Sequence, residues 1–277
     1  MTLDAFLATG GPVAAIEVTR VQGSAPREVG AWMLVSPQAT HATIGGGALE
    51  HRAIARARAL LAEGDEALDL ALPLGPAIGQ CCGGQVTLAI RRLDARGIAE
   101  HRARLAAQRA SDPPVAVFGA GHVGLALARA LALLPVRTLL VDSRSEALAA
   151  APAGVGTRLT PLPEAVVRAA RPGTAFVVMT HDHATDFLIA AEALARGDAA
   201  YVGLIGSASK RAAFEGWLKR EHGPSPAALT CPVGAAGRGD KRPAVIAAQV
   251  AAEVMAALTC RAVQAAPRHA APHAARA

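Results

Sequence analysis

The sequence predicts an α/β protein in which a small N-terminal α+β domain precedes a domain built on a parallel sheet. Two observations support this fold class. From Val115 onward, short apolar runs alternate with helical runs at the spacing of βαβ units. Before residue 95, strand-like runs and one long helical run are joined by glycine-rich turns. A length of 277 residues suits two domains of ordinary size.

The N-terminal domain is assigned to residues 1–94, and its elements follow from apolar periodicity. We expect a helix at Ala48–Glu63 and strands at Val13–Val18, Ala31–Val35 and Gln85–Ile90. An arginine-rich helical connector, residues 95–113, comes next. The sequence Ser-Asp-Pro-Pro at 111–114 ends that helix because proline cannot continue it.

The second domain is assigned to residues 114–261. Its candidate strands are Val115–Phe118, Thr138–Val141, Ala175–Thr180 and Tyr201–Ile205. A last helix, Ala244–Leu258, follows Pro243, a residue favoured at the first helical position. Residues 262–277 are rich in Ala, Pro, His and Arg without periodicity, which predicts a disordered tail.

The most informative motif is a glycine turn between the first strand and helix of the second domain. Gly119, Gly121 and Gly124 have G-x-G-x-x-G spacing, and the next strand ends at Asp142. In this context the first glycine makes the turn, the second lets a phosphate approach the backbone, and the third permits close helix–strand packing. An acid at Asp142 could accept a ribose hydroxyl. We therefore predict a Rossmann-like domain with an anion site at this turn.

Composition and charge exclude several classes of function. The net charge of +6 is concentrated in residues 91–109 and in the last 17 residues, and no nucleic-acid-binding motif accompanies it. No uninterrupted apolar run reaches the ~18 residues of a membrane span. The N-terminus lacks the basic region of a secretory signal, so we expect a cytoplasmic protein.

Size and apolar content favour a homodimer.

Two adjacent cysteines, Cys81 and Cys82, lie in the sequence Gly-Gln-Cys-Cys-Gly-Gly. Neighbouring cysteines cannot form an ordinary disulfide without strain. As thiolates they could bind a soft metal or carry sulfur, with Cys82 the preferred residue beside the glycines. The alternative is that one or both are small buried hydrophobic residues near a turn.

A second glycine turn, Thr43-Ile-Gly-Gly-Gly-Ala-Leu-Glu50, leads into the predicted helix of the first domain. Its backbone amides could hold an anion, or it could be a plain strand–helix turn.

Polar residues follow two strands of the second domain. His181, Asp182, His183 and Asp186 come after the strand at 175–180, where open α/β sheets bind ligands. They could contact a ligand, bind a metal or cap a helix.

A second polar group follows the strand at 201–205. Ser207 suits a helix N-cap. Lys210 and Arg211 oppose the dipole of that helix unless an anion neutralises them, so we expect them to bind phosphate. Replacing both with Gln would then stabilise the empty protein slightly.

Together these motifs resemble one family, the XdhC xanthine dehydrogenase accessory proteins. The resemblance rests on GSAPREVGAWMLV, IGGGALEHRAI, GQCCGGQVTL, VFGAGHVGLALARAL, VVMTHDHATD, YVGLIGSASKRAAF and CPVG…PAVIAA, and spans residues 16–258. The loop AAGRGDKR departs from the family's more aliphatic pattern.

The resemblance implies a chaperone without turnover of its own. Such proteins bind the molybdenum cofactor, a phosphate-bearing pterin, and present it to a cysteine desulfurase for sulfuration. They then insert it into the cofactor-binding subunit of xanthine dehydrogenase. Cys81 and Cys82 would be candidate molybdenum or sulfur contacts.

Two other functions stay open from the residues alone. The first is an NAD(P)-dependent oxidoreductase, the function most often found with this fold, in which His181 or His183 would be the proton donor. The fold alone does not decide the function. The second is a nucleotide-binding regulatory module. The ligand retained by the purified protein would discriminate among them.

Overall fold

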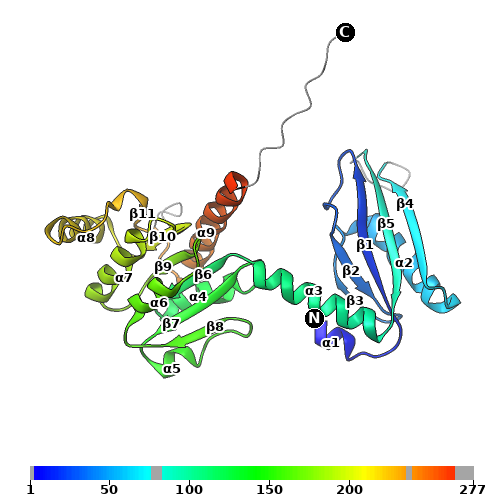
Figure 1. The fold of residues 1–277 in the computed structure, drawn as a ribbon, viewed down its shortest axis with the longest axis horizontal. Helices are drawn as coiled ribbons and strands as arrows, with labels where there is room; N and C mark the ends of the chain where they lie inside the picture. Colours follow the sequence, from blue (N-terminus) through cyan, green and yellow to red (C-terminus); the bar gives the residue numbers. More distant parts are fainter. Residues whose placement is uncertain (1–2, 76–82, 235–238, 266–277) are drawn as a thin grey trace, which may run out of the picture. The chain divides into compact units, whose positions relative to one another are not determined.

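The computed structural model describes residues 3–75, 83–234 and 239–265 of the chain, with side chains to residue 260. Two compact units, Met1–Leu105 and Ala106–Ala277, divide inside helix α3 (Ala95–Ser111), which occupies most of the predicted connector (Figure 1).

The first unit is a five-stranded antiparallel sheet with strand order β3-β2-β1-β5-β4. Its strands are β1 (Val13–Gln22), β2 (Trp32–Val35), β3 (Thr40–Ala42), β4 (Ala67–Pro73) and β5 (Gln85–Leu93). Helix α2 (Gly47–Glu63) packs on one face of this sheet. The fold class predicted for this part of the chain, α+β, is confirmed.

Alternating burial along β1 shows how the first unit is built. Ala14, Ile16 and Val18 are buried in the core under α2, as the period of two along a strand requires. On the other face, Phe6 of α1 (Leu3–Leu7) packs with Leu34. Helix α1 and strands β3 and β4 were not predicted from the sequence.

The second unit is a six-stranded parallel sheet with strand order β11-β10-β9-β6-β7-β8. The strands are β6 (Pro114–Phe118), β7 (Arg137–Asp142), β8 (Gly156–Leu159), β9 (Ala175–Val178), β10 (Tyr201–Leu204) and β11 (Leu229–Thr230). Strands β9 and β10 are buried along their whole length, because helices cover both faces of the sheet. This is the Rossmann-like topology that the sequence predicts.

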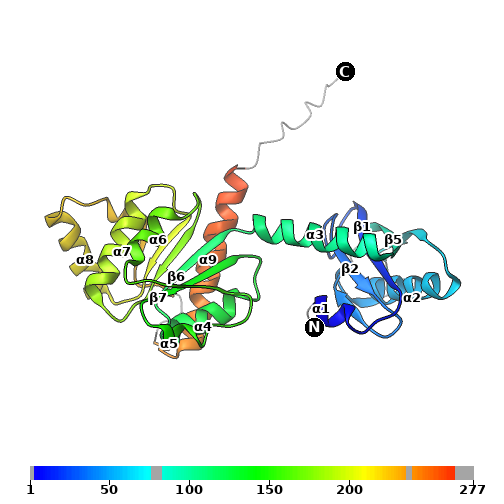
Figure 2. The same ribbon diagram turned by 60° about the horizontal axis from the view of Figure 1, so that its bottom comes forward.

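Helices cover the two faces of the parallel sheet in separate layers (Figure 2). Helices α4 (His122–Leu131) and α9 (Pro243–Ala265) pack against each other and share one core. The opposite core receives α6 (Pro163–Ala169), α7 (His183–Ala195) and α8 (Ala208–Arg220). The short helices α5 (Ser145–Leu148) and η2 (Pro226–Ala228) complete the unit.

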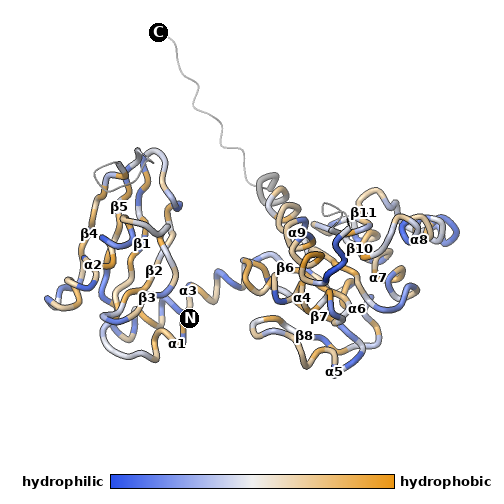
Figure 3. The backbone as a smooth tube through the Cα atoms, turned by 180° about the vertical axis from the view of Figure 1, so that it is seen from behind, coloured by the Kyte–Doolittle hydropathy of each residue, from blue (hydrophilic) through white to orange (hydrophobic). Residues whose placement is uncertain are grey.

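Helix α9 has the length and apolar composition of a membrane-crossing helix, and it is the one such helix among the described residues. Its strongly apolar character is visible in Figure 3. However, Ala247, Val250 and Val254 are buried in the core shared with α4, so one face of the helix is committed to the domain. The helix also runs past its predicted end at Leu258, so residues 262–265 of the predicted tail are helical. Residues 266–277 lie outside the described part.

Candidate functional site

The chain direction across the parallel sheet reverses at its centre, between β6 and β9. From β6 the chain proceeds to β7 and β8 on one side, and then returns to β9 and continues to β10 and β11 on the other. Ligands of open α/β sheets bind at such a switch point, beyond the carboxyl ends of the strands.

A small cleft of about 90 Å³ lies at this point. Residues that follow β6, β7, β8 and β9 line it, among them Gly119, Asp142, Ser143, Thr160, Thr180, His181, Asp182 and Thr185. Four of the predicted site residues, Gly119, Asp142, His181 and Asp182, therefore come together here. Ser143, Thr160 and Thr185 were missed by the sequence analysis, in the case of Thr160 because β8 was not predicted.

The three glycines of the turn have three different environments. Gly119 has a φ of +107°, and a Cβ atom there would overlap the carbonyl oxygen of Met179. A Cβ atom on Gly124 would overlap the carbonyl oxygen of Gly119. Gly121 instead has no neighbouring heavy atom within 4 Å of the Cβ position. The turn is therefore closed at its first and third glycines and open at its second.

The open glycine is also the N-cap of α4. Gly121 has an extended conformation, and no side chain caps the helix. The first amide groups of a helix have no partner within the helix, and together with the helix dipole they favour an anion. The space at Gly121 and the uncapped end of α4 thus coincide at one place, two residues along the chain from Gly119, which lines the cleft.

Asp142 is held by groups of the protein itself. Its side chain is 4% exposed and accepts hydrogen bonds from the backbone amide of Ala120 (2.7 Å) and from the backbone and guanidinium of Arg144 (3.0 Å each). Burial alone would raise the pKa of this carboxyl, but the hydrogen bonds from Arg144 and Ala120 outweigh burial and lower the pKa to about 2. A hydrogen bond from a ribose hydroxyl to Asp142 stays a prediction. The carboxylate of Asp142 would then have to accept from the ribose and from Arg144 together.

Replacement of Asp142 with Asn should destabilise the second unit in a pH-dependent way. Because the folded pKa of Asp142 is depressed, its contribution is present above the unfolded pKa of about 3.8 and disappears as the pH falls toward 2. We expect wild type and Asp142→Asn to differ by on the order of 2 kcal/mol in the free energy of unfolding at pH 6, and to converge as the pH falls to about 2. Urea unfolding across that range measures this. A difference that is constant with pH would contradict the depressed pKa.

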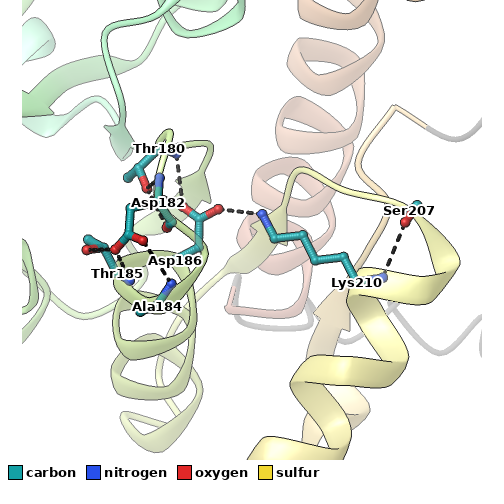
Figure 4. Close-up of polar contacts among 7 residues, drawn as sticks. All are labelled: Thr180, Asp182, Ala184, Thr185, Asp186, Ser207 and Lys210. Carbon is teal, nitrogen blue, oxygen red and sulfur yellow. Dashed lines mark hydrogen bonds and ion pairs between the residues drawn. The ribbon is translucent and has the colours of Figure 1, made fainter.

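The loop after β9 is built around two aspartates (Figure 4). Asp182 is the N-cap of α7, and its carboxylate accepts the backbone amide of Thr185 at 2.8 Å. Asp186 is fully buried; it accepts the backbone amide and hydroxyl of Thr180, at 2.9 and 2.7 Å, and forms an ion pair with Lys210. These contacts fix the wall of the cleft that carries His181.

The metal-binding alternative for this loop finds no support in the described residues, which contain no cluster of three His, Cys, Asp or Glu side chains suited to a metal. Both aspartates of the loop already have partners. His181 lines the cleft, whereas His183, the first residue of α7, does not. Asp182 confirms the helix-cap interpretation.

The structure corrects the argument made for Lys210 and Arg211. Lys210 is only 10% exposed at its side chain and pairs with the buried Asp186. Arg211 pairs with Glu215 at 2.8 Å and donates to the carbonyl oxygens of Leu229 and Cys231. Both cations therefore have partners in the protein. The prediction that Gln at both positions would stabilise the empty protein is wrong, because it assumed that the two charges were not neutralised.

Ser207 is the N-cap of α8, as predicted, and accepts the amide of Lys210 at 3.2 Å. Contacts of Ser207, Lys210 and Arg211 with a ligand stay predictions.

In the first unit, two glycine-containing segments meet the turn at 22–28. Gly83 forms a β-bridge with Ser24, and a Cβ atom on Gly84 would overlap the carbonyl oxygen of Ser24. On the other side of the same turn, Gly45 packs against the ring of Pro26. Cys81 and Cys82 lie outside the described residues, but the two glycines that follow them are fixed to this turn.

The second glycine turn already holds a carboxylate of the chain. Glu50, in the first turn of α2, accepts the backbone amides of Ile44 and Gly46, each at 3.0 Å, and the hydroxyl of Thr43. A backbone arrangement suited to an anion is therefore present, as one of the two interpretations expected. Its occupant in this structure is Glu50.

The fold and the site define a two-domain protein with an open Rossmann-type glycine turn. Two family models match the chain: the XdhC Rossmann domain at residues 115–254 and the XdhC and CoxI family at residues 6–70. The chain belongs to the XdhC family.

Similarity to individual proteins is distant. No curated protein sequence matches the chain. A Bacillus halodurans crystal structure, described as a xanthine dehydrogenase, has a TM-score of 0.77 at 18% identity and covers 96% of this chain and 97% of its own. That likeness establishes the shared fold. A myo-inositol dehydrogenase structure from Sinorhizobium meliloti covers 42% of this chain and 35% of its own, with 18% identity and a TM-score of 0.31. The latter score is too low to support an argument.

Proposed function

We propose that this protein is a chaperone for the molybdenum cofactor, which it binds, holds for sulfuration and inserts into xanthine dehydrogenase. Membership of the XdhC family supports a role in the maturation of xanthine dehydrogenase. The observation that carries the proposal is the open glycine turn: at Gly121 the backbone faces free space beside the uncapped start of α4. No other side chain occupies the space within 4 Å of the Cβ position at Gly121, which leaves an approach to these amides for an anionic group.

The residues at the switch point fit the phosphate end of such a cofactor. The free amides of α4 supply hydrogen-bond donors, and Ser143, Thr160 and His181 add polar side chains around the cleft. A volume of about 90 Å³ suits a phosphate-sized group, so the rest of the cofactor would extend outside this cleft. When bound, the cofactor supplies a molybdenum centre whose oxo ligand is exchanged for sulfido.

Cys81 and Cys82 are our candidates for the residues that contact molybdenum or hold sulfur in transit. Support comes from their chemistry, since thiolates are soft ligands, and from the neighbouring backbone. Gly83 and Gly84 lie against the turn at Ser24. The proposed partners are a cysteine desulfurase and the cofactor-binding subunit of xanthine dehydrogenase, met in the cytoplasm, with the chaperone as a homodimer.

The ligand retained on purification tests this proposal. We expect pterin fluorescence after oxidation, together with molybdenum by mass spectrometry, in protein isolated from cells that make the cofactor. A nicotinamide absorbance with neither signal would instead favour the oxidoreductase. Turnover of NAD(H) or NADP(H) with a hydroxy or oxo substrate, lost on replacing His181 and His183 together, would overturn the chaperone assignment.

Replacement of Cys81 and Cys82 with Ala should lower the molybdenum content of the isolated protein or its ability to activate xanthine dehydrogenase. Of the two single changes, Cys82→Ala should have a larger effect than Cys81→Ala, because Cys82 precedes Gly83, which is held by its β-bridge to Ser24. Cys260, an exposed free cysteine of α9, provides the matched control in Cys260→Ala. Wild-type molybdenum content and activation in the double variant would show that the paired cysteines are structural.

A further inference from the structure

A second opening in the second unit is larger than the cleft at the switch point. It has a volume of about 600 Å³, within the ~300–1,000 Å³ range typical of small-molecule sites. It lies between α6 and the strands β6, β7 and β8, beginning at their amino ends. Thr160 is the one described residue that lines both openings.

The floor of this cavity is apolar. Ala116 of β6 is 3% exposed, and Leu139 of β7 and Val166 of α6 pack against the same core. At its edge Leu162 is 58% exposed. A ligand with an apolar body would cover both the floor and this leucine.

Three arginines and no described carboxylate line the cavity. In the described chain the guanidinium groups of Arg137 and Arg158 have neither an ion pair nor a hydrogen bond. Arg137 and Leu139 are two residues apart on β7, and Arg158 pairs in register with Val141, so these side chains share one sheet face. Arg171 donates only to the carbonyl oxygen of Ala110, at 3.5 Å. Three positive charges thus surround an apolar floor without a compensating acid.

The geometry points to a second ligand site, for a small molecule that joins an apolar body to a carboxylate, sulfonate or phosphate group. The apolar part lies on Ala116, Leu139 and Val166, and the anion accepts hydrogen bonds from Arg137 and Arg158. Guanidinium groups match such oxyanions with paired, charge-assisted hydrogen bonds. The occupant is a small molecule because the space is bounded by α6 on one side and by the sheet on the other. This site is separate from the glycine turn and does not depend on the proposed function.

The test uses the full chain and the fluorescent dye anilinonaphthalene sulfonate, which has an apolar ring system and one anionic group. We expect one saturable site. The double variant Arg137→Gln/Arg158→Gln should weaken dye binding about tenfold, since two charge-assisted contacts are lost. Ala169→Phe should weaken it as well, because Ala169 is an exposed cavity residue of α6 that can accept a larger side chain. Benzoate and phenyl phosphate should both displace the dye.

Two control variants make the test specific. Arg129→Gln removes an exposed arginine of α4 that is not part of the cavity, and it should bind the dye as wild type does. Gly121→Val blocks the glycine turn, and it should keep the dye site that the double arginine variant loses. Unchanged dye binding in the double arginine variant would overturn the proposal. So would equally tight binding of the uncharged analogue phenylnaphthylamine. Displacement by a hexaglutamate peptide but by neither small anion would assign the cavity to an acidic protein segment instead.

Discussion

Asp186→Ala is expected to be among the most damaging single substitutions in the second unit. The buried carboxylate neutralises Lys210, whose side chain is 10% exposed, and it accepts two hydrogen bonds from Thr180. Removing it leaves a buried ammonium group and the backbone amide of Thr180 without partners, whereas the hydroxyl of Thr180 keeps the carbonyl oxygen of Asp182 as an acceptor. Breaking a buried ion pair in this way typically costs about 3–5 kcal/mol in the free energy of unfolding.

The measurement should report on the second unit alone. The chain has two tryptophans, Trp32 in the first unit and Trp217 on α8, where it packs with Phe187 and Phe214. In a Trp32→Phe background, urea unfolding followed by fluorescence therefore monitors the second unit.

The matched control is Glu192→Ala, on the same helix α7. Glu192 pairs with Arg168 at 3.1 Å, but both side chains are partly exposed, so the expected loss is below about 1 kcal/mol. The double variant Asp186→Ala/Lys210→Met should recover part of the stability lost in Asp186→Ala, because no unpaired charge remains. Equal losses in Asp186→Ala and Glu192→Ala would contradict the structural role of the buried pair.

Gly121→Val is expected to abolish ligand binding at the glycine turn while the protein stays folded. The Cβ position at Gly121 has no neighbour within 4 Å, and its φ of −76° suits any residue, so the valine side chain fits. The same side chain would fill the space through which a phosphate reaches the amides of α4. We expect at least a ~100-fold loss of affinity, comparable with ~3 kcal/mol.

Gly124→Ala is the contrasting substitution in the same turn. Its methyl group would overlap the carbonyl oxygen of Gly119, so the helix and the turn must separate. This variant should lose much more stability than Gly121→Val, whose cost is limited to a less favourable N-cap residue. Wild-type affinity in a folded Gly121→Val protein would exclude the turn as the ligand site.

Much of the fold could be predicted from the sequence, because the patterns that indicate its strands and its glycine turn are local. Strands β6 and β9 are buried on both faces and read as continuous apolar runs, and the glycine turn has a fixed spacing. Strand β8 was missed because its four residues are all exposed at the sheet margin, so neither an apolar run nor an alternation marks it. Asp142 with Arg144 is an interaction over two residues, which the spacing alone could have indicated.

Less of the candidate site could be predicted from the sequence, because its key contacts join segments that are far apart along the chain. Lys210 and Asp186 are 24 residues apart and meet only because α7 and α8 follow the neighbouring strands β9 and β10. No local pattern shows that a cation at the start of α8 has a partner on α7. The same limitation applies to Ser24, which adjoins Gly83 across nearly sixty residues.

The most direct test of the chaperone proposal is transfer of the cofactor to its client. Purified protein loaded with sulfurated molybdenum cofactor is mixed with cofactor-free xanthine dehydrogenase, and xanthine oxidation is followed over time. We predict that activation rises with the amount of loaded wild-type protein, and that Gly121→Val, treated identically, gives only the activation seen with free cofactor. Equal activation by wild type, by Gly121→Val and by free cofactor alone would contradict the account.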